Sequence, residues 1–255
     1  MWTRSLLKTN AKLVLRQNYW TAFLVCIVWL LFSFDASTLR LNFNLNYSTR
    51  AEYYNYQFNP FRVLGDFPLI NFLAGFMAAF GGVIFLICLL LQIFVANPMA
   101  VGRNRYFMES RVGDAPFSSL FSVFGNPGYW NIVKVMFLKN LSVFLWTLLL
   151  VFPGIYKSYQ YRMVDYLLAE NPYLPAGRAF ELSRMMTDGE KFNIFVLELS
   201  FWGWFFLGAM LFYIGTLFVH PYFYATYAEL YAAMRAKAFA YGMSDEEELS
   251  GFLQY

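Results

Sequence analysis

The stretch PLINFLAGFMAAFGGVIFLICLLLQIFVA (residues 68–96) runs for 29 residues without a charged side chain. A helix of about 20 apolar residues is long enough to cross the hydrocarbon core of a lipid bilayer, so this stretch predicts a transmembrane helix. Four other apolar stretches repeat the pattern, at residues 20–34, 141–152, 194–215 and 216–234. The sequence therefore predicts a multi-pass integral membrane protein.

The composition supports the same conclusion. Of the 255 residues, 59% are hydrophobic and 22% are aromatic, whereas only 14% are charged. A water-soluble protein of this size needs more polar side chains than that to cover its surface. We therefore expect an all-α fold that forms a single integral membrane domain over residues 1–255, with no sizeable soluble domain.

The pair Pro153-Gly154 decides how many spans we expect. If the pair closes a tight hairpin, residues 155–171 become a short sixth span, and both termini lie in the cytoplasm. Most lysines and arginines then fall in the predicted cytoplasmic segments, as the positive-inside rule requires. We therefore expect a polytopic bundle of about six transmembrane helices in the plasma membrane, with amphipathic helices at the membrane surface.

Five segments lie outside the predicted spans. They are an amphipathic interfacial helix, one extracellular segment, two cytoplasmic segments and a cytoplasmic tail. The interfacial helix comprises residues 1–18 and the extracellular segment residues 35–66. The cytoplasmic segments comprise residues 97–133 and 171–191, and the tail comprises residues 235–255.

The interfacial helix carries four cations at intervals of four residues, namely Arg4, Lys8, Lys12 and Arg16. At about 100° per residue they share one face of a helix, and apolar residues share the other. Near anionic headgroups each cation contributes about 1 kcal/mol of attraction. This face predicts contact with membrane lipids, and the plainer alternative is a simple topology anchor.

The predicted sixth span contains three charges, Lys157, Arg162 and Asp165. Charged side chains are costly inside a membrane and seldom face lipid. Arg162 and Asp165 are three residues apart and could neutralise each other on a helix, and Tyr161 adds a hydroxyl beside them. These residues predict a polar groove inside the bundle.

Other predicted spans offer further polar groups to such a groove. The candidate ligand-binding residues are Lys157, Tyr161, Arg162, Asp165, Glu198, His220 and Glu229. In the alternative interpretation, Lys157 and Arg162 extend to the membrane interfaces and the acids only fix the register of the helices. Cys26 and Cys88 are too isolated to indicate a metal site or a disulfide, and we expect no cofactor.

Five stretches form an ordered set of motifs. They are NPMAVGRNRYF from Asn97, PGIYKSYQYRMVDYLLAENP from Pro153, SRMMTDGEK from Ser183, LELSFWGW from Leu197 and VHPYFYATYAELY from Val219. Together they resemble the bacterial membrane family known as the domain-of-unknown-function family numbered 975, over roughly the whole chain except the extracellular segment. The family is found mainly in Gram-positive bacteria and is similar in architecture to the membrane domain attached to some glycerophosphodiester phosphodiesterases. The resemblance implies a membrane domain without an established activity.

We do not expect an enzyme. The chain has one histidine, and it lacks a His-Glu-x-x-His zinc motif, a glycine-rich phosphate loop and a Gly-x-Ser-x-Gly elbow. An intramembrane hydrolase would need Glu198, His220 and Glu229 to meet at a cavity that water can reach.

Two non-enzymatic functions remain. In the first, the polar groove binds an amphiphile, either a lipid or a membrane-active peptide, for transport, sequestration or resistance. Lys157 and Arg162 would hold its anionic group, and Asp165 would orient Arg162. In the second, the chain is a non-catalytic scaffold or accessory subunit of another membrane protein. We favour the first, and we expect membrane lipids, with a peptide or a membrane protein, as partners and no nucleic acid.

Overall fold

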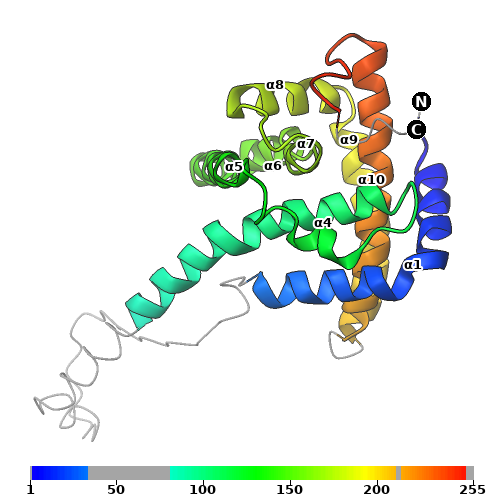
Figure 1. Ribbon diagram of the computed structural model, residues 1–255, viewed down its shortest axis with the longest axis horizontal. Helices are drawn as coiled ribbons and strands as arrows, with labels where there is room; N and C mark the ends of the chain where they lie inside the picture. The colour runs from blue at the N-terminus through cyan, green and yellow to red at the C-terminus, as the bar shows by residue number, and fades with distance from the viewer. Residues whose placement is uncertain (1, 34–80, 211–213, 251–255) are drawn as a thin grey trace, which may run out of the picture. The chain divides into compact units, whose positions relative to one another are not determined.

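The computed structural model describes residues 2–33, 81–210 and 214–250, and the expected extracellular segment, residues 35–66, lies outside them. Within the described residues the chain is helical and contains no strand, which confirms the all-α prediction for this part. The helices, coloured along the chain in Figure 1, are α1 (Arg4–Phe32), η1 (Gln92–Ala96), α4 (Asn97–Glu109), η2 (Phe117–Phe121), α5 (Tyr129–Leu149), α6 (Val151–Gln160), α7 (Val164–Glu170), α8 (Ala176–Thr187), α9 (Lys191–Met210) and α10 (Ile214–Ala240).

The chain divides into two compact units. The first comprises Met1–Ser33 with Ile93–Tyr255, and the second comprises Phe34–Gln92. Of the second unit the structure describes residues 81–92, which are helical. The first unit contains α1 and every helix from α4 to α10.

Four helical stretches among the described residues are long and apolar enough to cross a membrane. They are Arg4–Phe32, Gly81–Glu109, Tyr129–Leu149 and Lys191–Met210. In the first unit large apolar side chains point outward from such helices, since Leu148 on α5 is 73% exposed and Phe206 on α9 is 68% exposed. These helices indicate a membrane protein, because lipid solvates such faces and water does not.

The sequence also predicts a span at residues 216–234, but α10, which contains them, is not among these four stretches. With 27 residues α10 is long enough, yet it carries His220, Glu229 and several tyrosines. It packs against α1, α4, α8 and α9, and Thr226, Tyr227 and Glu229 are buried there. This helix can therefore be polar because protein surrounds it.

Residues 155–171, the predicted sixth span, do not form one continuous helix. Two short helices take its place, α6 with 10 residues and α7 with 7 residues, and residues 161–163 separate them. At about 1.5 Å per residue these helices are about 15 Å and about 10 Å long, whereas the hydrocarbon core is about 30 Å thick. Neither helix can cross the core alone.

The chain does reverse next to Pro153-Gly154, but the turn lies at Leu150. That residue has an extended backbone (φ −157°, ψ 138°) between α5 and α6. Pro153 lies in the first turn of α6, where its missing N–H breaks no helical hydrogen bond. A Cβ atom on Gly154 would lie 2.6 Å from the Cα atom of Thr147, so the glycine allows the two helices to meet closely.

The helices of the first unit run in different directions. α1 bends at Asn18, whose backbone angles (φ −123°, ψ 27°) are not helical. The half before the bend lies beside α10, and the half after it continues in another direction (Figure 1). In the same view α9 and α10 run vertically while α5, α6 and α7 are seen end-on. The helices of this unit therefore do not all share one direction.

After α10 the chain folds back onto α8. The turn contains Gly242, whose φ of +64° is a left-handed conformation that favours glycine. Arg178 of α8 donates from Nε and Nη2 to the two carboxylate oxygens of Glu248, at 2.6 and 2.9 Å, and Leu249 is fully buried. The expected cytoplasmic tail, residues 235–255, is thus helical at its start and packed against α8 as far as Leu249.

Replacing Arg178 by alanine should release this packed segment. The hydrogen bonds from Arg178 lower the pKa of the Glu248 carboxyl, so the pair stabilises the fold above the ordinary pKa of a glutamate and ceases to do so as the pH falls through the lowered pKa. We expect the stability of the packed segment to fall by about 1 kcal/mol, because both side chains are partly exposed. Limited proteolysis near neutral pH should cut the variant faster after Gly242, and the difference should vanish in acid.

Glu181→Gln is the matched control for this prediction. Glu181 also contacts Arg178, at 3.1 Å, but its side chain is 60% exposed. Its replacement should leave the cleavage rate unchanged. Equal cleavage of Arg178→Ala and the parent protein would mean that the burial of Leu249 alone holds the segment.

Candidate functional site

Arg162 and Glu198, which the sequence predicts for one polar groove, form an ion pair. Arg162 lies in the break between α6 and α7, and its guanidinium contacts the carboxylate of Glu198 on α9. Tyr159 and Tyr227 each donate a hydroxyl hydrogen bond to the same carboxylate. The charge of Arg162 is therefore balanced within the protein by Glu198.

Asp165 does not orient Arg162, in contrast to the prediction. It pairs with Lys139 on α5. The reason is local: the helix is interrupted at residues 161–163, so a spacing of three residues does not place Arg162 and Asp165 on one helical face. Two ion pairs between helices take the place of one pair within a helix.

Lys157 and His220 lie in two separate aromatic clusters. The Nζ atom of Lys157 is 5.4 Å from the ring centre of Trp146 and 5.5 Å from that of Tyr161. His220 stacks on Tyr224, with ring centres 5.9 Å apart. These contacts stabilise a cation and an imidazole without a carboxylate partner.

Glu229 lies in another place, toward the C-terminal end of α10. Arg111 donates to both of its oxygens, at 2.7 and 3.4 Å, and Asn10 donates to one of them at 3.3 Å. His220 and Glu229 are nine residues apart on one helix, which is about 13 Å along its axis. The three groups that an intramembrane hydrolase would need therefore do not meet.

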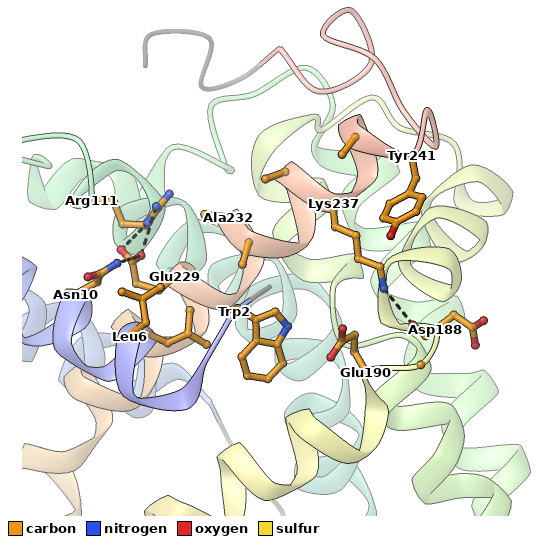
Figure 2. A pocket seen from close by; sticks show the side chains of 15 residues that line it. Trp2, Leu6, Asn10, Arg111, Asp188, Glu190, Glu229, Ala232, Lys237 and Tyr241 are labelled. Carbon is orange, nitrogen blue, oxygen red and sulfur yellow. Dashed lines mark hydrogen bonds and ion pairs between the residues drawn. The ribbon is translucent and has the colours of Figure 1, made fainter.

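A cavity of about 900 Å³ lies beside Glu229, between the start of α1, the α8–α9 connection and the end of α10 (Figure 2). The lining on α10 includes four alanines, Ala232, Ala233, Ala236 and Ala240. Trp2 and Leu6 line it from the N-terminal side, and the indole Nε1 of Trp2 is buried without a hydrogen-bond partner. Lys237 at its edge donates to the backbone oxygen of Asp188 at 3.1 Å. The cavity thus combines small apolar side chains with charged groups, as sites for amphipathic ligands do.

A second hollow of about 1010 Å³ lies between α1, α9 and α10, and we name it the α1–α9–α10 groove. Its lining comprises Trp204, Leu207, Gly208 and Met210 of α9, Gly215, Phe218, Val219 and Tyr222 of α10, and Lys8 and Lys12 of α1. A Cβ atom on Gly208 would lie 2.7 Å from the carbonyl carbon of Gly215. The two glycines therefore allow α9 and α10 to meet closely in this groove.

Lys8 and Lys12 lie at one end of this groove. The Nζ atom of Lys8 is 4.3 Å from the ring centre of Phe201 and donates to the backbone oxygen of Ser200 at 3.5 Å. Lys12 lies 5.7 Å from the ring centre of Tyr222. Among the described residues, neither lysine forms an ion pair. The groove therefore has a cationic end and apolar walls.

The cationic face of α1 is divided, whereas the sequence predicts that all four cations face the headgroups. Arg4, Lys12 and Arg16 are exposed and Lys8 is half-buried, but Lys8 and Lys12 also lie over aromatic rings of α9 and α10. The buried stripe of the helix consists of Leu7, Ala11 and Leu15, and Lys8, Lys12 and Arg16 each follow one of these residues. Of these three cations, the two lysines are the ones that lie over rings of the neighbouring helices.

Four partners of the predicted site residues were missed in the sequence: Asn10, Arg111, Lys139 and Tyr227. Each lies 26 or more residues from the acid that it contacts. No local spacing reveals such pairs. The one useful indication was Lys139 within an apolar stretch, since a charge at that position requires an opposite charge nearby.

Replacing Glu198 by glutamine should destabilise the protein, because it leaves the Arg162 guanidinium unpaired. Breaking a buried ion pair costs about 3–5 kcal/mol. We expect the free energy of unfolding to fall by about 3 kcal/mol, at the lower end of this range, because Arg162 is 37% exposed. Thermal unfolding in detergent, followed by tryptophan fluorescence, measures the effect. Lys157→Gln is the control and should change little, since in the described part of the chain Lys157 lies against the ring faces of Trp146 and Tyr161 and forms no ion pair.

The double variant Arg162→Met with Glu198→Gln separates charge from packing. It removes both charges and should recover most of the lost stability. If the double variant is as unstable as Glu198→Gln alone, the tyrosine hydrogen bonds to Glu198 matter more than the ion pair.

Comparison with known proteins places these residues in a family. The chain matches a family model over residues 23–238, and the family is described as protein of unknown function (DUF975). The match runs through residues 35–66, which the motif resemblance leaves out, and it begins after Lys8 and Lys12. No curated protein and no solved structure matches the chain. As its motifs predict, the chain belongs to the DUF975 family of proteins of unknown function.

Proposed function

We propose that the protein binds an anionic amphiphile, such as an anionic phospholipid, in the α1–α9–α10 groove. The observation that carries this proposal is the position of Lys8 and Lys12 at one end of an apolar hollow. The lysines would attract the anionic headgroup, and the groove would receive the apolar chain. The protein is then a binding protein of the membrane and not an enzyme.

The size and the lining of the groove support this proposal. Its volume of about 1010 Å³ is at the upper end of the range of about 300–1,000 Å³ that is typical of ligand pockets. Trp204 and Leu207 are more than half exposed, so an acyl chain could enter from the side. Aromatic and aliphatic walls with a few polar groups at one end are typical of sites for amphiphiles.

The charge balance favours this groove over the one predicted around Lys157 and Arg162. Arg162 is already paired with Glu198, and Lys157 lies between two rings. Lys8 and Lys12 have no carboxylate beside them in the described part of the chain. An anionic headgroup would supply the missing negative charge.

The location of the protein and the use of its ligand belong to the same proposal. The resemblance to the family supports a bacterial plasma membrane, and the distribution of lysine and arginine supports several spans with both termini in the cytoplasm. The similarity in architecture to the membrane domain of some glycerophosphodiester phosphodiesterases would suit a protein that handles lipids. The protein would transport the bound amphiphile, sequester it or confer resistance to it.

An accessory-subunit or scaffold function is the second candidate. It is favoured by the exposed apolar faces of α5 and α9, where Phe144 is 61% exposed and Trp202 is 65% exposed. Such faces suit a neighbouring membrane protein as well as lipid. We rank this function second because it gives no role to Lys8 and Lys12.

The test is a titration of the purified protein in detergent with phosphatidylglycerol, followed by native mass spectrometry. The double variant Lys8→Gln with Lys12→Gln should bind this lipid about 30-fold more weakly, because each lysine contributes about 1 kcal/mol of attraction. The matched control is Arg4→Gln with Arg16→Gln, which removes the same charge from exposed positions of α1 and should have a smaller effect.

Leu207→Trp tests the apolar part of the groove separately. Leu207 is 57% exposed and lines the groove. The larger indole side chain of tryptophan there should block the acyl chain without disturbing the lysines. Equal losses in the two double variants would indicate general attraction to the surface of α1 and would contradict the proposal. Crosslinking in membranes to one dominant protein partner, with unchanged lipid binding in all variants, would favour the scaffold function.

A further inference from the structure

Arg103 on α4 is a buried cation between two aromatic rings. The residue is only 5% exposed, and the central carbon of its guanidinium lies 4.1 Å from the ring centre of Trp29 and 3.7 Å from that of Tyr224. Its Nε and Nη2 atoms both donate to the side-chain oxygen of Asn104, at 3.3 and 2.9 Å. Its Nη1 atom is buried and has no hydrogen-bond partner.

Arg103 differs from the other cations that lie between the helices. Arg111, Lys139, Arg162 and Arg235 each have a carboxylate within ion-pair distance. Arg103 has none among the described residues. The ring faces of Trp29 and Tyr224 stabilise a cation but do not neutralise it, and an isolated charge is costly in a medium of low polarity.

Two other rings of this cluster carry unsatisfied polar atoms. The indole Nε1 of Trp29 is buried without a partner, and so is Nδ1 of His220. Trp29 and His220 both contact Tyr224, with ring centres 5.8 and 5.9 Å away. The same cluster therefore contains an unbalanced positive charge and unused hydrogen-bonding atoms from two further helices, α1 and α10.

We infer that Arg103, with Trp29 and His220 beside it, binds a phosphate oxyanion. A guanidinium is well suited to phosphate, because its N–H groups form charge-assisted hydrogen bonds, and the indole N–H would donate a further one. The phosphate belongs either to a lipid headgroup or to free inorganic phosphate, which present the same oxygen atoms. This site is separate from the α1–α9–α10 groove, which Arg103 does not line.

The experiment compares the parent protein with Arg103→Gln in a detergent and a buffer that contain no phosphorus. Saturating inorganic phosphate should raise the unfolding temperature of the parent by about 5 °C over chloride at the same ionic strength. Arg103→Gln should show no such rise. Arg16→Gln is the matched control, since it makes the same change at an exposed arginine, and it should behave like the parent.

A phosphorus assay on the purified proteins distinguishes the two sources. If free phosphate leaves the parent unchanged, a tightly held phospholipid should add about one phosphorus atom per chain to the parent compared with Arg103→Gln. Trp29→Phe provides a second variant, because it keeps a ring face against Arg103 and removes the indole N–H. It should weaken the phosphate response or the lipid retention.

The unfolding temperature without phosphate also separates binding from packing. An unbalanced buried charge is costly, so Arg103→Gln should then be at least as stable as the parent. A lower stability of this variant, together with equal phosphate response and equal phosphorus content in all proteins, would overturn the inference and leave Arg103 as a packing residue. Should Arg103→Gln not fold, the same two comparisons between Trp29→Phe and the parent decide.

Discussion

A charge removed from water needs an opposite charge beside it, and four ion pairs satisfy this requirement between the helices of the first unit. They join Arg162 to Glu198, Lys139 to Asp165, Arg111 to Glu229 and Arg235 to Glu170. Each pair links elements that are far apart in the sequence. Removing one partner would leave the other buried and unpaired, so these contacts fix which helices meet and in which register.

α10 is the helix on which most of this arrangement depends. It supplies Glu229 and Arg235 to two of the pairs, and Tyr227 and Tyr231 donate to the acids Glu198 and Glu170. Its polar side chains are tolerated because α1, α4, α8 and α9 surround it. Beside its buried apolar core, the unit has large apolar side chains on the outside of α5 and α9, as expected for helices that face lipid.

Against this background, unbalanced cations are the exceptions that suggest binding. Lys8 and Lys12 lie at one end of an apolar groove, and Arg103 lies between two aromatic rings. In the described part of the chain, none of these three cations has a carboxylate beside it. The two places differ in kind. The groove is open and suits an amphiphile with a long apolar part, whereas the Arg103 side chain is buried and offers its guanidinium to a phosphate oxyanion. Both would gain a negative charge from a ligand that the protein does not supply itself.

The sequence by itself determined the class of protein. Long apolar stretches and few charges predict membrane helices, and five ordered motifs indicate the family. It could not determine how residues 155–171 fold, because an apolar stretch with a few charges suits one short span or two packed helices equally well. The acids Glu198 and Glu229 were recognisable as candidate site residues, but their partners were not. Only the tertiary structure decided that Arg162 meets Glu198 and that Asp165 meets Lys139, since ion pairs between helices depend on packing across the whole unit and leave no trace in local spacing.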